Sequence, residues 1–127
     1  MNLYLIDDDL VARMALVDVV ESITAGKGFK LTEFDSADEA WAALSTTSVT
    51  PDMVLCDIRM PGMSGLEFIQ AVRKNTLTQD TKILVVSSSL SREELVHAMQ
   101  AGANSCLVKP FSPNTFAQHL NHVIGEK

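Results

Sequence analysis

Short, mostly apolar runs alternate with helix-like patterns along the whole chain, and this alternation constrains the fold more than any other feature. Four of the runs are almost entirely apolar and have the length of a β-strand. Strands that are apolar on both faces are typical of parallel sheets covered by helices on both sides. The pattern therefore predicts an α/β protein of five strand–helix units with a doubly wound, five-stranded parallel sheet.

The boundaries of these elements follow from turn residues and helix caps. Ser36 with Glu39 and Ser91 with Glu94 have the spacing of a capping box, and Pro113 follows Ser112 as at many helix starts. Strand 30–34 alternates polar and apolar residues, as an edge strand does. The expected strands are 3–6, 30–34, 53–56, 82–87 and 105–108, and the expected helices are about 10–22, 36–44, 64–74, 91–101 and 113–124.

Size and composition limit the class of protein. A chain of 127 residues is long enough for one domain with its own core, and we expect that domain to cover residues 1–127. The net charge of −6 and the lack of a basic cluster argue against direct nucleic-acid binding. No apolar run reaches the roughly 18 residues of a membrane span, and no signal peptide is visible. We interpret Cys56 and Cys106 as reduced residues that pack in the interior. Because reduced cysteines are typical of the cytoplasm, we expect a cytoplasmic protein.

Polar side chains stand at the carboxyl ends of four of the expected strands. Asp7 and Asp8 follow the first strand, Asp57 the third, Ser87 ends the fourth and Lys109 follows the fifth. Each residue alone is weak evidence, but the carboxyl ends of parallel strands meet at one edge of the sheet. Three neighbouring carboxylates would repel one another, and a divalent cation or the ammonium of Lys109 would relieve this repulsion. Mg²⁺ suits such an all-oxygen site.

The order and spacing of these residues resemble the receiver domain of two-component response regulators. The resemblance covers almost the whole chain. It is carried by Leu5-Ile6-Asp7-Asp8-Asp9, by Asp57 with the stretch Met60-Pro61-Gly62-Met63-Ser64-Gly65-Leu66-Glu67, by Val86-Ser87-Ser88, by Ala101-Gly102-Ala103 and by Lys109-Pro110-Phe111. The resemblance implies a flavodoxin-like fold with strand order 2-1-3-4-5.

The resemblance also implies a role for each of these residues. Asp57 would be the phosphoacceptor and would take a phosphoryl group from a sensor histidine kinase or a histidine phosphotransfer protein. Asp8, Asp57 and the backbone carbonyl of Arg59 would bind Mg²⁺, and Asp7 would act through a coordinated water. Lys109 and Ser87 would contact phosphoryl oxygens. The Lys109–Pro110 peptide bond is expected to be cis, as in many relatives.

Signalling through changed protein contacts is the implied output, to a downstream protein or a fused output domain. Catalysis would be limited to self-phosphorylation from small phosphodonors and self-dephosphorylation. Because the given chain ends close to the last helix, a stand-alone receiver is the first expectation and the N-terminal receiver of a longer regulator the second. Direct contact with nucleic acid or a membrane is not expected.

The sequence departs from the family pattern at Cys106, where receivers usually carry Tyr or Phe. A cysteine cannot act as the aromatic ring that rotates toward the phosphorylation site, so the output would need backbone or loop shifts. Cys106 reads as a small packing residue rather than a redox sensor. Arg59 and Ser89 occupy positions that tune acyl-phosphate hydrolysis in the family. For Asp9, a place just outside the metal shell and a plain solvated charge remain open.

Two surface features bear on partners. On helix 10–22 the residues Ala12, Leu16, Val19, Val20 and Ile23 form the expected core stripe. The apolar residues Leu10, Val11, Met14 and Val17 lie outside that stripe, where relatives dock kinase or phosphotransfer helices, and we expect docking here as well. His119 and His122 share a face of the last helix and read as surface residues.

Two other functions remain as alternatives. A phosphatase of the haloacid-dehalogenase type also uses an aspartate nucleophile with Mg²⁺, but it needs a second acid two residues later, where this chain has Arg59. A non-phosphorylated pseudo-receiver that acts as an interaction scaffold is the second alternative. The intact set of Asp8, Asp57, Ser87 and Lys109 argues against it, while Cys106 keeps it open.

Overall fold

The computed structural model describes residues 2–46, 50–88, 90–109 and 111–124. Within these ranges strands and helices alternate, and the strands form one parallel sheet in the order β2-β1-β3-β4-β5. The flavodoxin-like α/β architecture and its strand order are therefore confirmed. The elements are β1 (Asn2–Ile6), α1 (Leu10–Thr24), β2 (Lys30–Phe34), α2 (Ala37–Thr46), β3 (Met53–Cys56), α3 (Gly65–Lys74), β4 (Lys82–Ser87), α4 (Arg92–Ala101), β5 (Ser105–Val108) and α5 (Pro113–Ile124).

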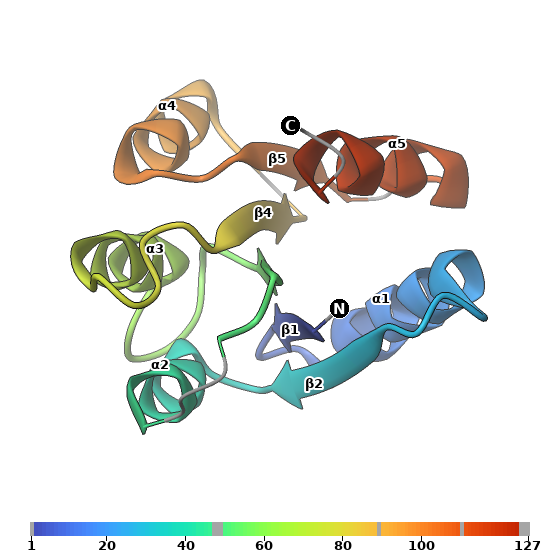
Figure 1. The fold of residues 1–127 in the computed structure, drawn as a ribbon. Coiled ribbons are helices and arrows are strands. Elements are labelled where there is room, and N and C mark those ends of the chain that lie inside the picture. Colours follow the sequence, from blue (N-terminus) through green and yellow to red (C-terminus); the bar gives the residue numbers. More distant parts are fainter. Residues whose placement is uncertain (1, 47–49, 89, 110, 125–127) are drawn as a thin grey trace.

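Helices cover both faces of the sheet. Figure 1 shows α1 and α5 on one face, and α2, α3 and α4 on the other. Side chains of successive strand residues point to opposite faces, so each strand supplies both layers. Leu3 and Leu5 of β1 pack on the α1–α5 side, whereas Ile6 packs on the α2–α3–α4 side. This alternation explains why the central strands are apolar at nearly every position.

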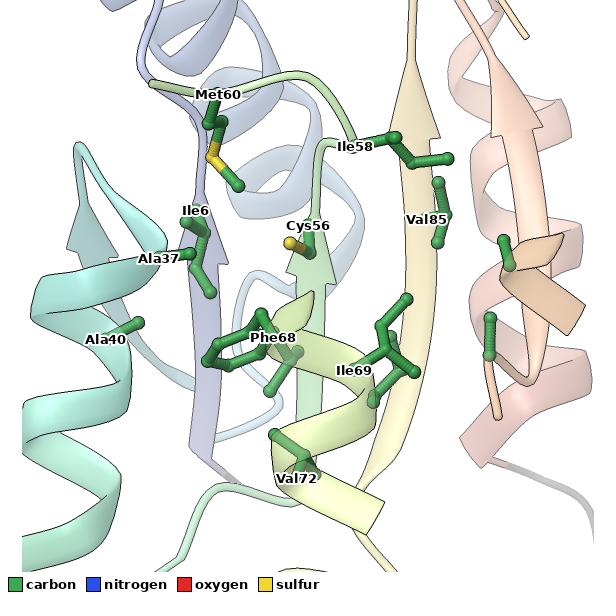
Figure 2. Packing of buried hydrophobic residues seen from close by; sticks show 14 of the residues in the cluster. Ile6, Ala37, Ala40, Cys56, Ile58, Met60, Phe68, Ile69, Val72 and Val85 are labelled. Atoms are coloured by element: carbon green, nitrogen blue, oxygen red, sulfur yellow. The ribbon is translucent and has the colours of Figure 1, made fainter. Parts of the chain in front are cut away.

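The core on the α2–α3–α4 side is centred on α3. Phe68, Ile69 and Val72 are fully buried and point from one face of α3 toward the sheet, as Figure 2 shows. Cys56 of β3 lies in the same layer and is also buried. Truncating a buried phenylalanine costs about 3–5 kcal/mol, so this layer holds the central strands firmly. The ends of β1 and β3, where the polar residues follow, rest on it.

The helices differ from the expected ranges mainly at their ends. Helix α1 continues to Thr24, two residues beyond the expected end, and the Thr24 hydroxyl donates to the Val20 carbonyl at 2.7 Å. The capping box of Ser91 and Glu94 is confirmed, and Ser64 forms a second one with Glu67, which was not predicted from the sequence. The Ser36 hydroxyl accepts from the Glu39 N–H at 3.1 Å, as a capping residue does.

Two expectations concern residues outside the described part of the chain, and the expectation for the histidines of the last helix was only partly met. Pro110, with its expected cis bond, and Ser89 lie outside the described residues. His122 is exposed as expected, but His119 is half-buried, and its Nδ1 lies 3.0 Å from the Ser105 hydroxyl. Among the described residues, no helix has the length and apolar character needed to cross a bilayer.

Candidate functional site

The register of the sheet brings the polar strand ends together. Ile6 pairs with Cys56, so Asp7 and Asp57 follow neighbouring residues, and the Asp57 N–H donates to the Ile6 carbonyl at 3.2 Å. Ser87 pairs with Val108, and the Lys109 N–H donates to the Ser87 carbonyl at 2.7 Å. Backbone pairing alone thus places Asp7, Asp57, Ser87 and Lys109 along one edge of the sheet.

Three aspartates form a compact cluster at this edge. Carboxylate oxygens of Asp7, Asp8 and Asp57, one from each, all lie within 4.8 Å of one another. Asp7 is 2% exposed, Asp57 is half-buried and Asp8 is exposed. The cluster therefore runs from the buried strand ends out to the solvent, and a small ligand could reach it from outside.

Lys109 neutralises the most buried of the three carboxylates. Its Nζ lies 2.8 Å from Asp7 Oδ2, and the Lys109 side chain is only 18% exposed. The other oxygen of Asp7 accepts the Asp9 N–H at 2.9 Å. Both oxygens of Asp7 are thus engaged, and one ammonium group faces three carboxylates. The site keeps an excess of negative charge.

The environment of Asp57 disfavours its charged form. Burial is the largest influence and raises the pKa of Asp57 above its usual value, and the charge of Asp7 raises it further. The Ile58 N–H, which donates to Asp57 Oδ1 at 2.7 Å, lowers the pKa, as do the charge of Lys109 and a hydrogen bond from Ser87. Because the raising influences win, a positive charge placed beside Asp57 would stabilise its ionised form.

The start of α3 packs directly on the backbone of Asp57. The Gly65 N–H donates to the Ile58 carbonyl at 2.8 Å, and a Cβ at position 65 would lie 2.1 Å from the Asp57 carbonyl oxygen. No side chain fits at that distance, so the position requires glycine. In the sequence Gly65 stands out only as part of the stretch that resembles receiver domains, and its close approach to Asp57 appears in the tertiary structure.

The side chains of Asp9 and Arg59 have partners outside the carboxylate cluster. Asp9 is the N-cap of α1, and its side chain accepts the N–H groups of Val11 and Ala12 at 3.0 and 3.3 Å. Neither role weighed for Asp9 from the sequence anticipated this cap. The Arg59 side chain pairs with Glu94 at the start of α4, 2.7 Å from Nη2 to Oε1. The expected binding of Mg²⁺ by the backbone carbonyl of Arg59 stays a prediction.

Cys106 occupies the β5 face that packs toward α4. The side chain is half-buried, and its Sγ lies 3.9 Å from the Sδ of Met99. Burial raises the pKa of the Cys106 thiol. Thiols with a raised pKa react slowly, so the surroundings agree with a packing residue.

The roles of two backbone N–H donors and one arginine of the site could not be predicted from the sequence. The N–H groups of Ile58 and Asp9 bind Asp57 and Asp7, and Arg13 donates from Nη1 to the Asp7 carbonyl at 2.7 Å. Any residue except proline carries a backbone N–H, so the residue types at these positions say nothing of that role. Arg13 also binds Glu33 of β2, a contact that depends on the α1–β2 arrangement.

The fold and this acidic strand-end site define a class of signalling protein. The family model described as the response regulator receiver domain matches residues 3–121, and the chain belongs to this family. The general function of the family is to accept a phosphoryl group in two-component signalling.

Chemotaxis proteins are among the similar sequences. Chemotaxis protein CheY1 of Helicobacter pylori is 27% identical over 126 residues, which cover 98% of each chain. A putative response regulator from Chloroflexus aurantiacus has a TM-score of 0.86 and 26% identity, over 98% of both chains. The receiver domain of sensor histidine kinase PA1611 from Pseudomonas aeruginosa has a TM-score of 0.84 and 21% identity, over 98% of both chains, so it is similar to this chain in fold. That structure was solved with a magnesium ion in its active-site cleft.

Proposed function

We propose that residues 1–127 act as one receiver domain that accepts a phosphoryl group on Asp57. The observation that carries this proposal is the cluster of Asp7, Asp8 and Asp57, whose carboxylate oxygens lie within 4.8 Å of one another beside Lys109. Of the three, Asp57 combines partial exposure with a position at the end of a central strand. The buried Asp7 has both oxygens engaged and is a poor nucleophile.

Phosphoryl transfer at this site requires one bond exchange. A carboxylate oxygen of Asp57 attacks the phosphorus of a phosphohistidine, and a P–O bond forms while the P–N bond breaks. The electron pair of the broken bond stays on the imidazole nitrogen, and Asp57 becomes an acyl phosphate. With a small phosphodonor such as acetyl phosphate, the P–O bond to the acetyl group would break instead and acetate would leave with its electron pair. Attack of water on the phosphorus of the acyl phosphate would return the free carboxylate and inorganic phosphate.

The donor set fits one Mg²⁺ ion. Oxygens bound to the same Mg²⁺ lie at most about 4.2 Å apart, so the observed cluster needs only a small adjustment. Asp8, Asp57 and the Arg59 carbonyl would hold the ion directly, and Asp7, with both oxygens occupied, would act through a water. When bound, the ion supplies positive charge that screens the approach of an anionic phosphoryl group to an anionic carboxylate.

Lys109 and Ser87 would contact the oxygens of the phosphoryl group. Lys109 pairs with Asp7 in the unphosphorylated protein. It would also donate to the phosphoryl group on Asp57, because that group has more negative charge and more acceptor oxygens than a carboxylate. Ser87 is buried at the end of β4 and already bonds Asp57. Ser87 therefore needs little movement to reach a group on Asp57.

Partners of this domain would be a histidine kinase or a histidine phosphotransfer protein upstream and a protein target or fused output domain downstream. The upstream partner would dock on the α1 docking face, which we define as the exposed residues Leu10, Val11 and Met14. An apolar cavity of about 250 Å³ adjoins the helix and includes Lys109 among its lining residues. The two free cysteines suit the reducing conditions of the cytoplasm, our proposed location.

Intact mass spectrometry tests the phosphoacceptor. After incubation with acetyl phosphate and Mg²⁺, we expect one phosphoryl adduct on the wild-type chain and none on Asp57→Asn. Asp52→Asn is the matched control, because Asp52 lies just before the same strand at its other end and bonds the Asn2 N–H. This variant should form the adduct normally, and chelation of Mg²⁺ should abolish it in both.

A short-lived acyl phosphate could escape detection, so binding of beryllofluoride with Mg²⁺ gives a second measurement. Beryllofluoride takes the place of the phosphoryl group on a carboxylate and does not hydrolyse in the same way. A wild-type chain that forms no adduct and binds no beryllofluoride would overturn the proposal. The pseudo-receiver scaffold would then be the better account of this chain.

A further inference from the structure

Helix α4 is held loosely by its apolar side chains. Ala98 is its only fully buried residue, whereas Leu95, Val96 and Met99 are 40–45% exposed. Helix α3, of the same length, buries four residues against the sheet. Since burial of apolar area is the main force that fixes a helix in place, the position of α4 depends more than usual on polar contacts at its two ends.

The carboxyl end of α4 is fixed by a half-buried arginine. Arg73 of α3 donates from Nε and Nη2 to the carbonyl of Gly102, the C-cap residue, at 3.0 and 2.8 Å. The same guanidinium bonds the carbonyls of Gln79 and Thr81 and the Asn104 side chain. A cation at the last carbonyls of a helix is stabilising, and five bonds from one partly buried group form a rigid attachment.

At the amino end of α4, a partly exposed ion pair joins the helix to the loop after β3. Glu94 Oε1 accepts from Arg59 Nη2 at 2.7 Å and also from the Ser91 N–H at 2.9 Å, within the capping box. The Arg59 side chain is 60% exposed and Glu94 21%. An exposed ion pair contributes only about 0–1 kcal/mol, so this contact can be broken by a modest competitor.

Arg59 lies two residues after Asp57, on the loop that leads from β3 to α3. A phosphoryl group on Asp57 would bring close to two negative charges and three acceptor oxygens beside this loop. Such an anion attracts a guanidinium more strongly than one carboxylate does, and it can accept two parallel hydrogen bonds from it. Arg59 would then have two competing partners, Glu94 and the phosphoryl group.

We propose that Glu94 is a positioning residue that competes with the phosphorylated Asp57 for Arg59, so that phosphorylation releases the amino end of α4 while Arg73 keeps its carboxyl end fixed. The inference rests on the proposed phosphorylation of Asp57. It supplies a route for the signal that needs no aromatic ring at Cys106, because the moving group is the arginine itself. Release would pivot α4 about Gly102.

Beryllofluoride affinity in the presence of Mg²⁺ measures the competition directly. In Glu94→Gln the capping box is kept, since glutamine accepts the same backbone N–H, but the charge that holds Arg59 is removed. We expect this variant to bind beryllofluoride roughly two- to fivefold more tightly than wild type, the range of an exposed ion pair. Glu93→Gln is the matched control, because it removes the same charge one residue away, and its affinity should equal that of wild type.

Arg59→Ala completes the cycle. In that background Glu94→Gln should no longer change the affinity, because the group for which Glu94 competes is gone. A general effect of removing negative charge would instead persist with alanine at position 59 and would appear equally in Glu93→Gln. Either result would overturn the inference.

Amide hydrogen exchange followed by NMR reports the release of α4. The Glu94 and Leu95 N–H groups, bonded to the Ser91 side chain and carbonyl, should exchange roughly two- to fivefold faster with beryllofluoride bound. The Ala103 N–H, bonded to the Ala98 carbonyl, should not change. Beryllofluoride binding without faster exchange at Glu94 and Leu95 would sink this inference alone. A wild-type chain that binds no beryllofluoride and also forms no phosphoryl adduct would sink the proposed function with it.

Discussion

The thiol of Cys106 is half-buried among packing contacts, and in the described part of the chain no charged group shifts its pKa. Its Sγ lies beside Met99, and burial raises its pKa, while the fully buried Cys56 has its pKa raised by burial and by the charges of Asp57 and Asp7. The thiolate is the reactive form, so both cysteines should be poor nucleophiles.

We therefore expect both cysteines of the native chain to react with iodoacetamide at mildly alkaline pH several-fold more slowly than those of the unfolded chain. Mass spectrometry of labelled peptides measures each site separately. Unfolding in urea is the control, because it should expose both thiols to labelling at the same rate. Native labelling of Cys106 as fast as in urea would contradict the packing assignment and support a redox role.

Helix α1 presents apolar side chains to solvent at the edge that holds the site. Leu10, Val11 and Met14 are 58%, 75% and 57% exposed, as the sequence predicted, while Val17 is half-buried against the core on that side. The amino end of the helix begins at the Asp9 cap, directly after Asp8. A partner bound to this face would thus lie next to the cluster of aspartates.

Met14→Glu should reduce phosphotransfer from a phosphorylated histidine phosphotransfer protein roughly tenfold, as expected for the loss of an apolar contact residue in an interface. Transfer is measured by the decay of phosphohistidine. Leu77→Glu is the matched control, because Leu77 is 76% exposed and follows α3 near the starts of β3 and β4, at the opposite edge of the sheet. Equal rates for Met14→Glu and wild type would remove the α1 docking face from the proposal.

At the scale of the whole molecule, the raised pKa of Asp57 links stability to pH. Burial and the charge of Asp7 raise the pKa of Asp57, so the folded state favours the protonated carboxyl more than the unfolded state does. Such a group costs stability above its folded pKa, and the cost disappears as the pH falls through that pKa toward the unfolded value.

Without divalent cations, Asp57→Asn should therefore melt at a higher temperature than wild type at neutral pH. The difference should shrink as the pH falls, because wild-type Asp57 then becomes protonated as well. Mg²⁺ should raise the melting temperature of the wild type and leave Asp57→Asn nearly unchanged. Thermal unfolding by circular dichroism across the pH range, with and without chelator, measures each effect. An Asp57→Asn variant less stable than wild type at neutral pH would contradict this account.

The sequence by itself determined the architecture of this protein and the set of residues at its strand ends. The apolar runs ending in Asp7, Asp57, Ser87 and Lys109 required a parallel sheet, and the carboxyl ends of parallel strands meet at one edge. Periodicity carries this information because strand residues alternate between two faces, and each face here is covered by helices.

Only the tertiary structure decided which partner each of these groups meets. That Lys109 binds Asp7 and that Arg59 reaches Glu94 depends on segments far apart in sequence. That Gly65 packs on the backbone of Asp57 depends on the course of the loop between β3 and α3. Long side chains such as those of Lys109 and Arg59 can reach several neighbours, so their residue types do not indicate which neighbour they bind. The packing of the helices against the sheet decides which neighbour each side chain binds, because it sets the distances between them. The sequence only places these side chains at the same edge of the sheet.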